Sequence, residues 1–384
     1  MNKLVFPAIL AVISQNPGAC AAWSPDFEGR LVQAAPLTAA FQSAPPAPPA
    51  SPGFSAAARA FYPETLSPAE FDGGTARGRA ALAPDARAAE FLFITDEMKR
   101  VYSHLENKER LFSFSFEALK ADYLAKVSAA ASETDYRRLV QNFISAFSDP
   151  HLAIRFAQPS GGKNAAERII SNDVTGDGIL VTRIERLYGT PQELEQLSAG
   201  LDESLTLAKT ARALVVDMRG NPGGNDAYGR YFISRLVAHF IPTGKTTVKI
   251  SRETIERYGS RLQEDPARPG WGTWWEGGVE PQTEESFKGP LALLIDGGCV
   301  SSCEGTAVMF KFSGAARLYG AATMGSSGYP AIIELPGGRG QVYIPTWIRI
   351  MPDGNPIEDH GVYPDVETDP AQALERALAD IRAE

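Results

Sequence analysis

Histidine, cysteine and positive charge are all scarce in this 384-residue chain. It has four histidines and three cysteines, and 46 acidic residues outnumber 37 basic ones, which gives a net charge of −9. Such a charge balance argues against nucleic acid as a partner. No run after the N-terminus reaches the roughly 18 consecutive apolar residues of a membrane helix. With 44% apolar and 22% charged residues, the composition is that of a globular chain of about two domains.

The N-terminal segment predicts export. Lys3 precedes a short apolar run, and Ala19-Cys20-Ala21 provides the small residues of a signal-peptidase site. We therefore expect residues 1–21 to be a signal peptide, and the mature protein to be periplasmic or extracellular with no integral membrane segment. A buried first strand or helix is an alternative. A lipoprotein anchored through Cys20 is another, although Pro17 stands where such sites usually have leucine.

The rest of the chain divides by composition and periodicity. Residues 22–74 are rich in Ala, Pro and Ser, which predicts a linker. Apolar residues then follow helical spacing, so residues 75–150 are expected to form a small helical domain. Strand-like runs such as Ala213–Met218 alternate with helical patterns over residues 151–384, which predicts an α/β core (α+β for the chain as a whole).

The stretch Asp296-Gly-Gly-Cys-Val-Ser-Ser-Cys-Glu304 offers a candidate nucleophile. The apolar run 289–295 before it reads as a buried strand, and the residues from Thr306 read as a buried helix. Ser301 would lie on the turn between them, where the free N–H groups of a helix N-terminus can bind an oxyanion. An ordinary helix-capping serine is the alternative.

The two cysteines of this stretch flank the candidate serine. Removal of the signal peptide would leave only Cys299 and Cys303, and such a pair in an oxidising compartment predicts a disulfide. Two free buried thiols are the alternative. A metal site is disfavoured, because two thiols without a nearby histidine make a poor ligand set.

His151 is the histidine best placed for chemistry. The last helical pattern of the N-terminal part ends at Asp149-Pro150, since proline cannot continue a helix, and alternating residues after His151 predict a strand. A histidine fixed at this corner is a candidate general base, with a capping or exposed histidine as the alternative. His104 and His239 lie in helical patterns and are expected to be structural.

A glycine-rich turn, Arg219-Gly-Asn-Pro-Gly-Gly-Asn225, follows another buried strand. Glycines allow backbone N–H groups to approach a ligand closely. The turn is neither a P-loop nor a dinucleotide-binding fingerprint.

Taken in order, these motifs resemble the tail-specific, or C-terminal processing, serine peptidases, and especially their tricorn-like branch. The matching segments are Asp149–His151, Val216–Gly224, the Ser301 turn with Glu304, and Met351–Gly354 followed by Ile357–Asp365. The resemblance extends from about residue 75 to the C-terminus. It implies a crotonase-like catalytic domain over residues 151–384, peptide or protein substrates, and no cofactor.

The resemblance also implies roles for individual residues. Ser301 matches the nucleophile, and the backbone N–H groups of Gly223 and Ser302 would form the oxyanion hole. In the processing branch a lysine is the base, but here Ser326 occupies that position, and no lysine follows Lys311. The Ser–Lys dyad is therefore absent.

The tricorn-like branch implies a different base. His151 would take the proton of the nucleophile, and Glu358 would orient the imidazole and stabilise imidazolium. Asp359 and His360 are neighbouring candidates for the role of Glu358.

The sequence thus predicts a secreted serine endopeptidase that acts through an acyl-enzyme. A non-catalytic protein that binds a peptide or a hydrophobic ligand is the alternative, and ester hydrolysis is a third reading. About twenty-five residues separate Phe156 from Leu180, too few for a PDZ domain. The Trp271–Trp275 cluster would line a substrate cleft or anchor a surface loop. The sequence does not determine the oligomeric state.

Overall fold

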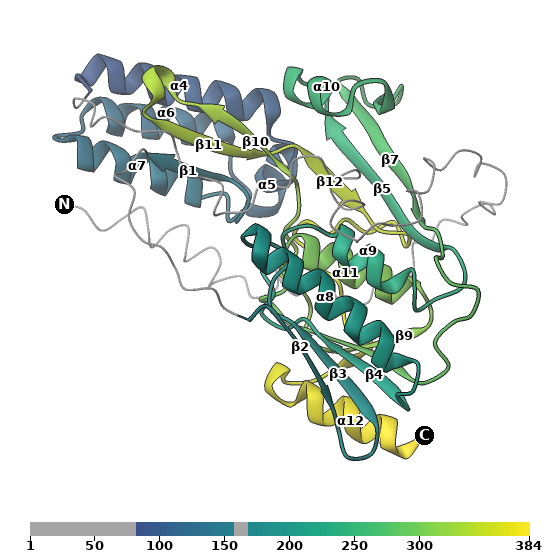
Figure 1. The fold of residues 1–384 in the computed structure, drawn as a ribbon. Helices are drawn as coiled ribbons and strands as arrows, with labels where there is room; N and C mark the ends of the chain where they lie inside the picture. The colour runs from purple at the N-terminus through teal and green to yellow at the C-terminus, as the bar shows by residue number, and fades with distance from the viewer. Residues whose placement is uncertain (1–81, 157–167) are drawn as a thin grey trace.

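A computed structural model describes residues 82–156 and 168–384 (Figure 1). The predicted signal peptide (1–21) and linker (22–74) lie outside these residues. The helices are α4 (Pro84–Val101), α5 (Leu105–Phe112), α6 (Phe116–Ser128), α7 (Glu133–Ser145), α8 (Pro191–Ala208), α9 (Ala227–Ile233), α10 (Arg252–Tyr258), α11 (Ser302–Phe312) and α12 (Ala373–Ala383). The strands are β1 (Ala153–Phe156), β2 (Ile170–Val174), β3 (Ile179–Ile184), β4 (Ala213–Asp217), β5 (Ile241–Lys249), β6 (Gln263–Glu264), β7 (Trp271–Val279), β8 (Leu291–Ile295), β9 (Ala316–Gly320), β10 (Pro330–Glu334), β11 (Gly340–Pro345), β12 (Trp347–Ile350) and β13 (Val366–Glu367).

A six-stranded sheet in the order β13-β9-β8-β4-β3-β2 forms the α/β core. Its strands are parallel except for β2, which pairs antiparallel with β3. β8 is apolar throughout, and β4 is apolar except for its last residue, Asp217. Both strands are buried along their whole length. Continuous apolar runs are typical of parallel strands covered on both faces.

Helices cover both faces of this sheet (Figure 1). Leu214 and Val216 of β4 pack on the side of α8, α9 and α11, whereas Ala213 and Val215 point to the side of α12. This alternation follows from the two-residue period of a strand. Proline at the first position of α8 and a Thr190–Glu193 capping box fix where the crossover helix between β3 and β4 begins.

The N-terminal helices α4 to α7 share a core with a second sheet, in the order β1-β11-β10. Phe91 and Phe143 from the helices lie in one apolar cluster with Ile154 of β1 and with Val342 and Ile344 of β11. The helical part is therefore completed by strands from residues 330–345. Its packing does not end at residue 150, where the sequence placed a domain boundary.

A third sheet, β12-β5-β7-β6, connects these two parts of the molecule. It carries the tryptophan cluster on β7. The chain passes directly from β11 at Pro345 to β12 at Trp347, so the second and third sheets meet at one corner (Figure 1). Among the described residues, no helix is both long and apolar enough to cross a bilayer.

Candidate active site

Ser301 lies on a turn between β8 and α11 with an unusual backbone conformation. Its φ is +59° and its ψ is −119°, and α11 begins at the next residue. A positive φ is rare for a residue with a side chain and persists only where the surroundings enforce it. Here the backbone N–H of Ser301 donates to the carbonyl of Ser326 at 3.0 Å and to the carboxylate of Glu304 at 3.0 Å.

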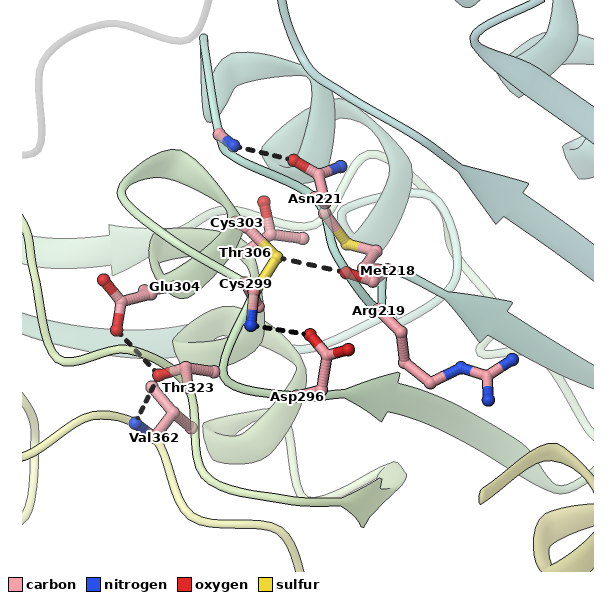
Figure 2. Close-up of a disulfide and its surroundings, with 12 residues drawn as sticks. Met218, Arg219, Asn221, Asp296, Cys299, Cys303, Glu304, Thr306, Thr323 and Val362 are labelled. Atoms are coloured by element: carbon pink, nitrogen blue, oxygen red, sulfur yellow. Dashed lines mark hydrogen bonds between the residues drawn. A yellow bond between two sulfur atoms is a disulfide. The ribbon is translucent and has the colours of Figure 1, made fainter. Parts of the chain in front are cut away.

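A disulfide brackets this turn. Cys299 and Cys303 are bonded to each other, with Cα atoms 5.3 Å apart, and both side chains are fully buried. Figure 2 shows the bond beside Met218, whose carbonyl oxygen lies 3.6 Å from the sulfur of Cys303. The bond therefore connects the loop between β8 and α11 to the first turn of α11, and it faces the end of β4.

Glu304 is the polar centre of the turn. It is fully buried and accepts hydrogen bonds from the Thr323 hydroxyl and from the backbone N–H groups of Ser301, Gly325 and Ser326, at 2.7–3.0 Å. Thr323 in turn accepts from the N–H of Val362 (Figure 2). Burial raises the pKa of Glu304 to about 8, because desolvation outweighs the four donated hydrogen bonds.

The glycine-rich turn packs directly on the Ser301 turn. A Cβ atom on Gly223 would lie 2.6 Å from the Val300 carbonyl oxygen and 2.9 Å from the Ser302 nitrogen, so only glycine fits there. The hydroxyl of Ser302 donates to the carbonyl of Gly224 at 2.7 Å. The two turns are thus joined by contact and by hydrogen bonding.

The N–H groups of these turns differ from the predicted oxyanion pair. The N–H of Gly223 donates to the side chain of Asn221 at 2.8 Å and is therefore occupied. Asn221 is buried and donates to the carbonyl of Ile184, so its orientation is fixed. The N–H groups of Ser302 and Gly224 have no acceptor among residues 82–156 and 168–384. Geometry thus favours Gly224 over Gly223 as the partner of Ser302.

His151 lies where the sequence placed it, between α7 and β1. Its backbone N–H donates to the carboxylate of Asp149 at 2.9 Å, and its ring Nδ1 is 2.8 Å from the hydroxyl of Ser326. Its Nε2 is hydrogen-bonded to no group in the described part of the chain, Ser301 included. Burial lowers the pKa of His151, despite the opposing charge of Asp149, so the imidazole is neutral near pH 7.

Asp149 ties His151 to a buried polar cluster that the sequence did not reveal. Its second carboxylate oxygen accepts from Tyr102 and from Nδ1 of His104, each at 2.8 Å. His104 Nε2 donates to the carbonyl of Trp347 at 2.7 Å. Burial alone would lower the pKa of His104, but Asp149, Glu358 and the carbonyl of Trp347 together raise it above the ordinary histidine value. The sequence placed His104 in a helical pattern, but it occupies the N-cap position of α5, without a side-chain cap hydrogen bond.

Glu358 does not contact His151 directly, contrary to the sequence expectation. It is buried, accepts from the hydroxyl of Ser327 and from the N–H of Arg349, and lies 3.8 Å from Nε2 of His104. The segment carrying Ser326 and Ser327 provides the partner of each group, so Ser326 faces His151 and Ser327 faces Glu358. Burial raises the pKa of Glu358, partly offset by His104. Glu358 is also not among the groups that shift the pKa of His151.

The two neighbouring candidates for the role of Glu358 point elsewhere. Asp359 accepts from Lys108 and Asn107 of α5. His360 bonds through Nδ1 to the carbonyl of Gly361 and packs edge-on against Tyr363. Neither side chain has a hydrogen bond to His151 within the described residues.

Ser301 and His151 line one cavity of about 330 Å³. One wall is the outer face of the second sheet, where Ala153, Tyr343 and Ile332 stand side by side on β1, β11 and β10. The glycine-rich turn and the start of α11 form another part of the lining. A smaller polar cavity of about 160 Å³, lined by His104, Asp149, Ser326 and Glu358 among others, lies behind His151.

Aromatic residues from the third sheet and from the segment just before β10 reach the larger cavity. Trp347 and Tyr329 line it, and Trp347 stacks on Trp274, which stacks on Tyr258, with ring centroids 5.6 and 4.7 Å apart. The predicted tryptophan cluster on β7 thus supports the cleft from behind, while Trp347 lines it. No cluster of three or more metal-ligating side chains occurs in the described part of the chain.

Comparison with known proteins identifies a family. Residues 178–368 match the model of peptidase family S41. No curated protein sequence matches the chain. Among solved structures, mature CPAF aligns with a TM-score of 0.60 and 11% identity over 77% of this chain and 95% of that one. A Parabacteroides merdae protein (TM-score 0.58, 15%, 78% and 97%) and a lipoprotein from Streptococcus agalactiae (0.52, 16%, 80% and 99%) share the fold.

Proposed function

We propose that the protein is a secreted endopeptidase that acts through an acyl-enzyme on Ser301. The match of residues 178–368 to peptidase family S41 makes it a serine-type peptidase. The observation that supports this assignment is the arrangement of the turn. Ser301 is held at a positive φ at the start of α11, in the same cavity as a neutral histidine and beside two N–H groups that find no acceptor in the described part of the chain.

In the proposed mechanism, His151 acts as general base. A proton on Nδ1 donates to Ser326, which leaves the lone pair of Nε2 for the hydroxyl of Ser301. Substrate binding would bring these two side chains into hydrogen-bonding distance, as is common for catalytic pairs that are loose in the free enzyme. After Ser301 attacks, the protonated imidazole gives its proton to the leaving amine.

The N–H groups of Ser302 and Gly224 would stabilise the oxyanion formed by this attack. One such donor is typically worth about 3 kcal/mol of barrier. Water then hydrolyses the acyl-enzyme by the reverse proton transfers. Glu358 would act indirectly, because its buried carboxyl group accepts a hydrogen bond from Ser327 and so holds this serine beside the cavity.

Export is part of the proposal. The signal-like N-terminus predicts it, and a buried disulfide at the site is chemically suited to an oxidising compartment. Cell fractionation with N-terminal sequencing of the mature protein tests it, and an intact Met1 on cytoplasmic protein would contradict it.

A fluorophosphonate label combined with peptide-library digestion tests the enzymatic part. We expect the wild-type protein to be labelled on Ser301 and to cleave internal peptide bonds, and Ser301→Ala to do neither while keeping its thermal unfolding temperature. Peptide binding without labelling or cleavage would favour the non-catalytic binding protein. Cleavage of esters alone would favour an esterase.

A further inference from the structure

One carboxylate in the cavity of Ser301 has no partner among the residues that the structure describes. Asp226 is half-buried and lines the catalytic cavity, yet its carboxylate makes no hydrogen bond or ion pair among residues 82–156 and 168–384. The other acidic groups near the site are all engaged: Asp149 with His104, Glu304 with the Ser301 turn, and Glu358 with Ser327.

Asp226 is not needed to cap the helix that follows it. It occupies the position before α9 but accepts no hydrogen bond from that helix. The side chain of Asn225 instead accepts from the N–H of Ala227 at 2.9 Å. The local structure therefore leaves the carboxylate of Asp226 available to a ligand.

Gly305 brings this carboxylate close to the nucleophile. A Cβ atom on Gly305 would lie 3.2 Å from Oδ2 of Asp226, so the carboxylate rests over the first turn of α11. Gly305 comes four positions after Ser301, which corresponds to a rise of about 6 Å along the start of α11. The four-carbon stem of a lysine spans a comparable length. Residue 305 itself has no side chain that would occupy the space beside this carboxylate.

We propose that Asp226 determines substrate specificity by binding the cationic side chain, lysine or arginine, of the residue that supplies the scissile carbonyl. This inference rests on the proposed function. When a substrate fills the cavity and removes water, an unpaired carboxylate is costly and a paired one is not, so a cation is favoured over a neutral residue of equal size.

The cationic groups that line the cavity come from other elements. Arg155 of β1 stacks over Tyr343 at 5.2 Å, and Arg349 of β12 donates to Thr246 at 3.0 Å. Neither forms an ion pair with Asp226. The end of the cleft at α9 and α11 thus has one negative charge of its own.

Two diphenyl phosphonate probes test this assignment on the full-length protein. One has lysine at the position next to phosphorus, and the other has norleucine, which has a similar length without the charge. Ser301 attacks phosphorus and displaces phenol, so the rate of labelling reports recognition without requiring turnover. We expect the lysine probe to label Ser301 at least about tenfold faster, a difference of 1.4 kcal/mol.

Variants assign the preference to one residue. The lysine-to-norleucine ratio should fall toward one in Asp226→Asn, and should persist in Glu276→Gln, which removes an exposed carboxylate on β7. Equal rates in the wild type, or an unchanged ratio in Asp226→Asn, would overturn the inference while labelling still supports the peptidase. The wild-type ratio decides this even if Asp226→Asn does not fold. Absence of labelling by either probe would overturn both the proposed function and the inference.

Discussion

The two members of the proposed catalytic pair are held in different ways. Ser301 belongs to the α/β core, where a disulfide, a positive φ and the buried Glu304 fix its backbone. His151 stands at the end of the helical part, where side-chain hydrogen bonds to Asp149 and Ser326 hold it. Each residue donates its backbone N–H to a buried acidic side chain, but only the turn of the nucleophile is also closed by a covalent bond, whereas the base is held by hydrogen bonds alone.

This difference has a consequence for function. The position of the nucleophile depends on local groups within a few residues of Ser301 and on the 323–326 segment. The position of the base depends on a cluster that joins α5, β12 and the end of α7 through His104 and Asp149. Movement of the helical part relative to the α/β core would therefore shift His151 first, and the pair is completed only where the two parts meet.

The largest expected effect comes from removing the base itself. His151→Ala should lower kcat/KM by about 10²- to 10⁴-fold, the usual contribution of a general base. Asp149 and Ser326 both remain in this variant, so folding should be retained. Steady-state kinetics on one peptide, with thermal unfolding as the control, measures it. Near-wild-type activity in folded protein would show that another group takes the proton.

The second prediction tests the support of the nucleophile. Above about pH 8, where Glu304 is ionised and both its oxygens accept, Glu304→Gln keeps one acceptor oxygen but turns an amide N–H₂ toward backbone donors, and each buried donor left unpaired costs about 1–3 kcal/mol. We expect a lower free energy of unfolding and at least a tenfold lower kcat. The same change at exposed Glu276 should do neither.

The titration of Glu304 gives this prediction a second readout. With its pKa raised from 4.5 to about 8 in the folded state, the unfolded carboxyl ionises first as the pH rises. The wild-type free energy of unfolding should therefore fall between about pH 4.5 and 8. Urea titrations of both proteins across this range should show that Glu304→Gln has lost this part of the slope. An identical slope in the two proteins would show that the pKa of Glu304 is not raised in the folded state.

Features set by local sequence could be predicted, whereas contacts between distant parts of the chain could not. Ser301 and His151 lie in contiguous motifs, and the alternating strands and helices of the core are a local pattern, so both could be predicted. The partner of His151 could not, because Ser326 is 175 positions away in the chain. The pairing of β1 with β11 is equally long-range, and it places residues 340–345 in the core of the helical part.

The sequence-based errors within the site have local physical causes. Gly223 matches a family glycine, but its N–H is occupied by Asn221, and only the folded turn shows this. The expectation that Glu358 would orient the imidazole of His151 and stabilise its imidazolium form assumed direct contact. In the structure Ser326 and Ser327 lie between Glu358 and His151, and burial lowers the pKa of His151.

The third prediction concerns the disulfide. Replacing both Cys299 and Cys303 by alanine should lower the free energy of unfolding by about 2 kcal/mol, from the entropy of a five-residue loop. Activity should fall by less than tenfold, because Glu304 and Ser326 still hold the N–H of Ser301. Each single alanine variant should equal the double variant, since either breaks the same bond. Additive losses in the single variants would show that the side chains matter by packing alone.

The smallest expected effect concerns the hydrogen bond between His151 and Ser326. In the wild type, kcat/KM should fall at acid pH with an inflection below the ordinary histidine value of about 6.5, because burial lowers the pKa of His151. Ser326→Ala removes the acceptor of Nδ1–H, which the imidazolium needs more than the neutral ring, so the inflection should move further toward acid. The rate above the inflection should drop only several-fold, as Asp149 still positions the backbone of His151.

Ser327→Ala is the matched control, because its hydroxyl bonds to Glu358 and not to His151. The backbone groups of Ser326 that contact Ser301 and Glu304 are kept in both variants. A pH–rate profile that is the same in Ser326→Ala as in the wild type would show that the hydroxyl merely fills space beside the imidazole.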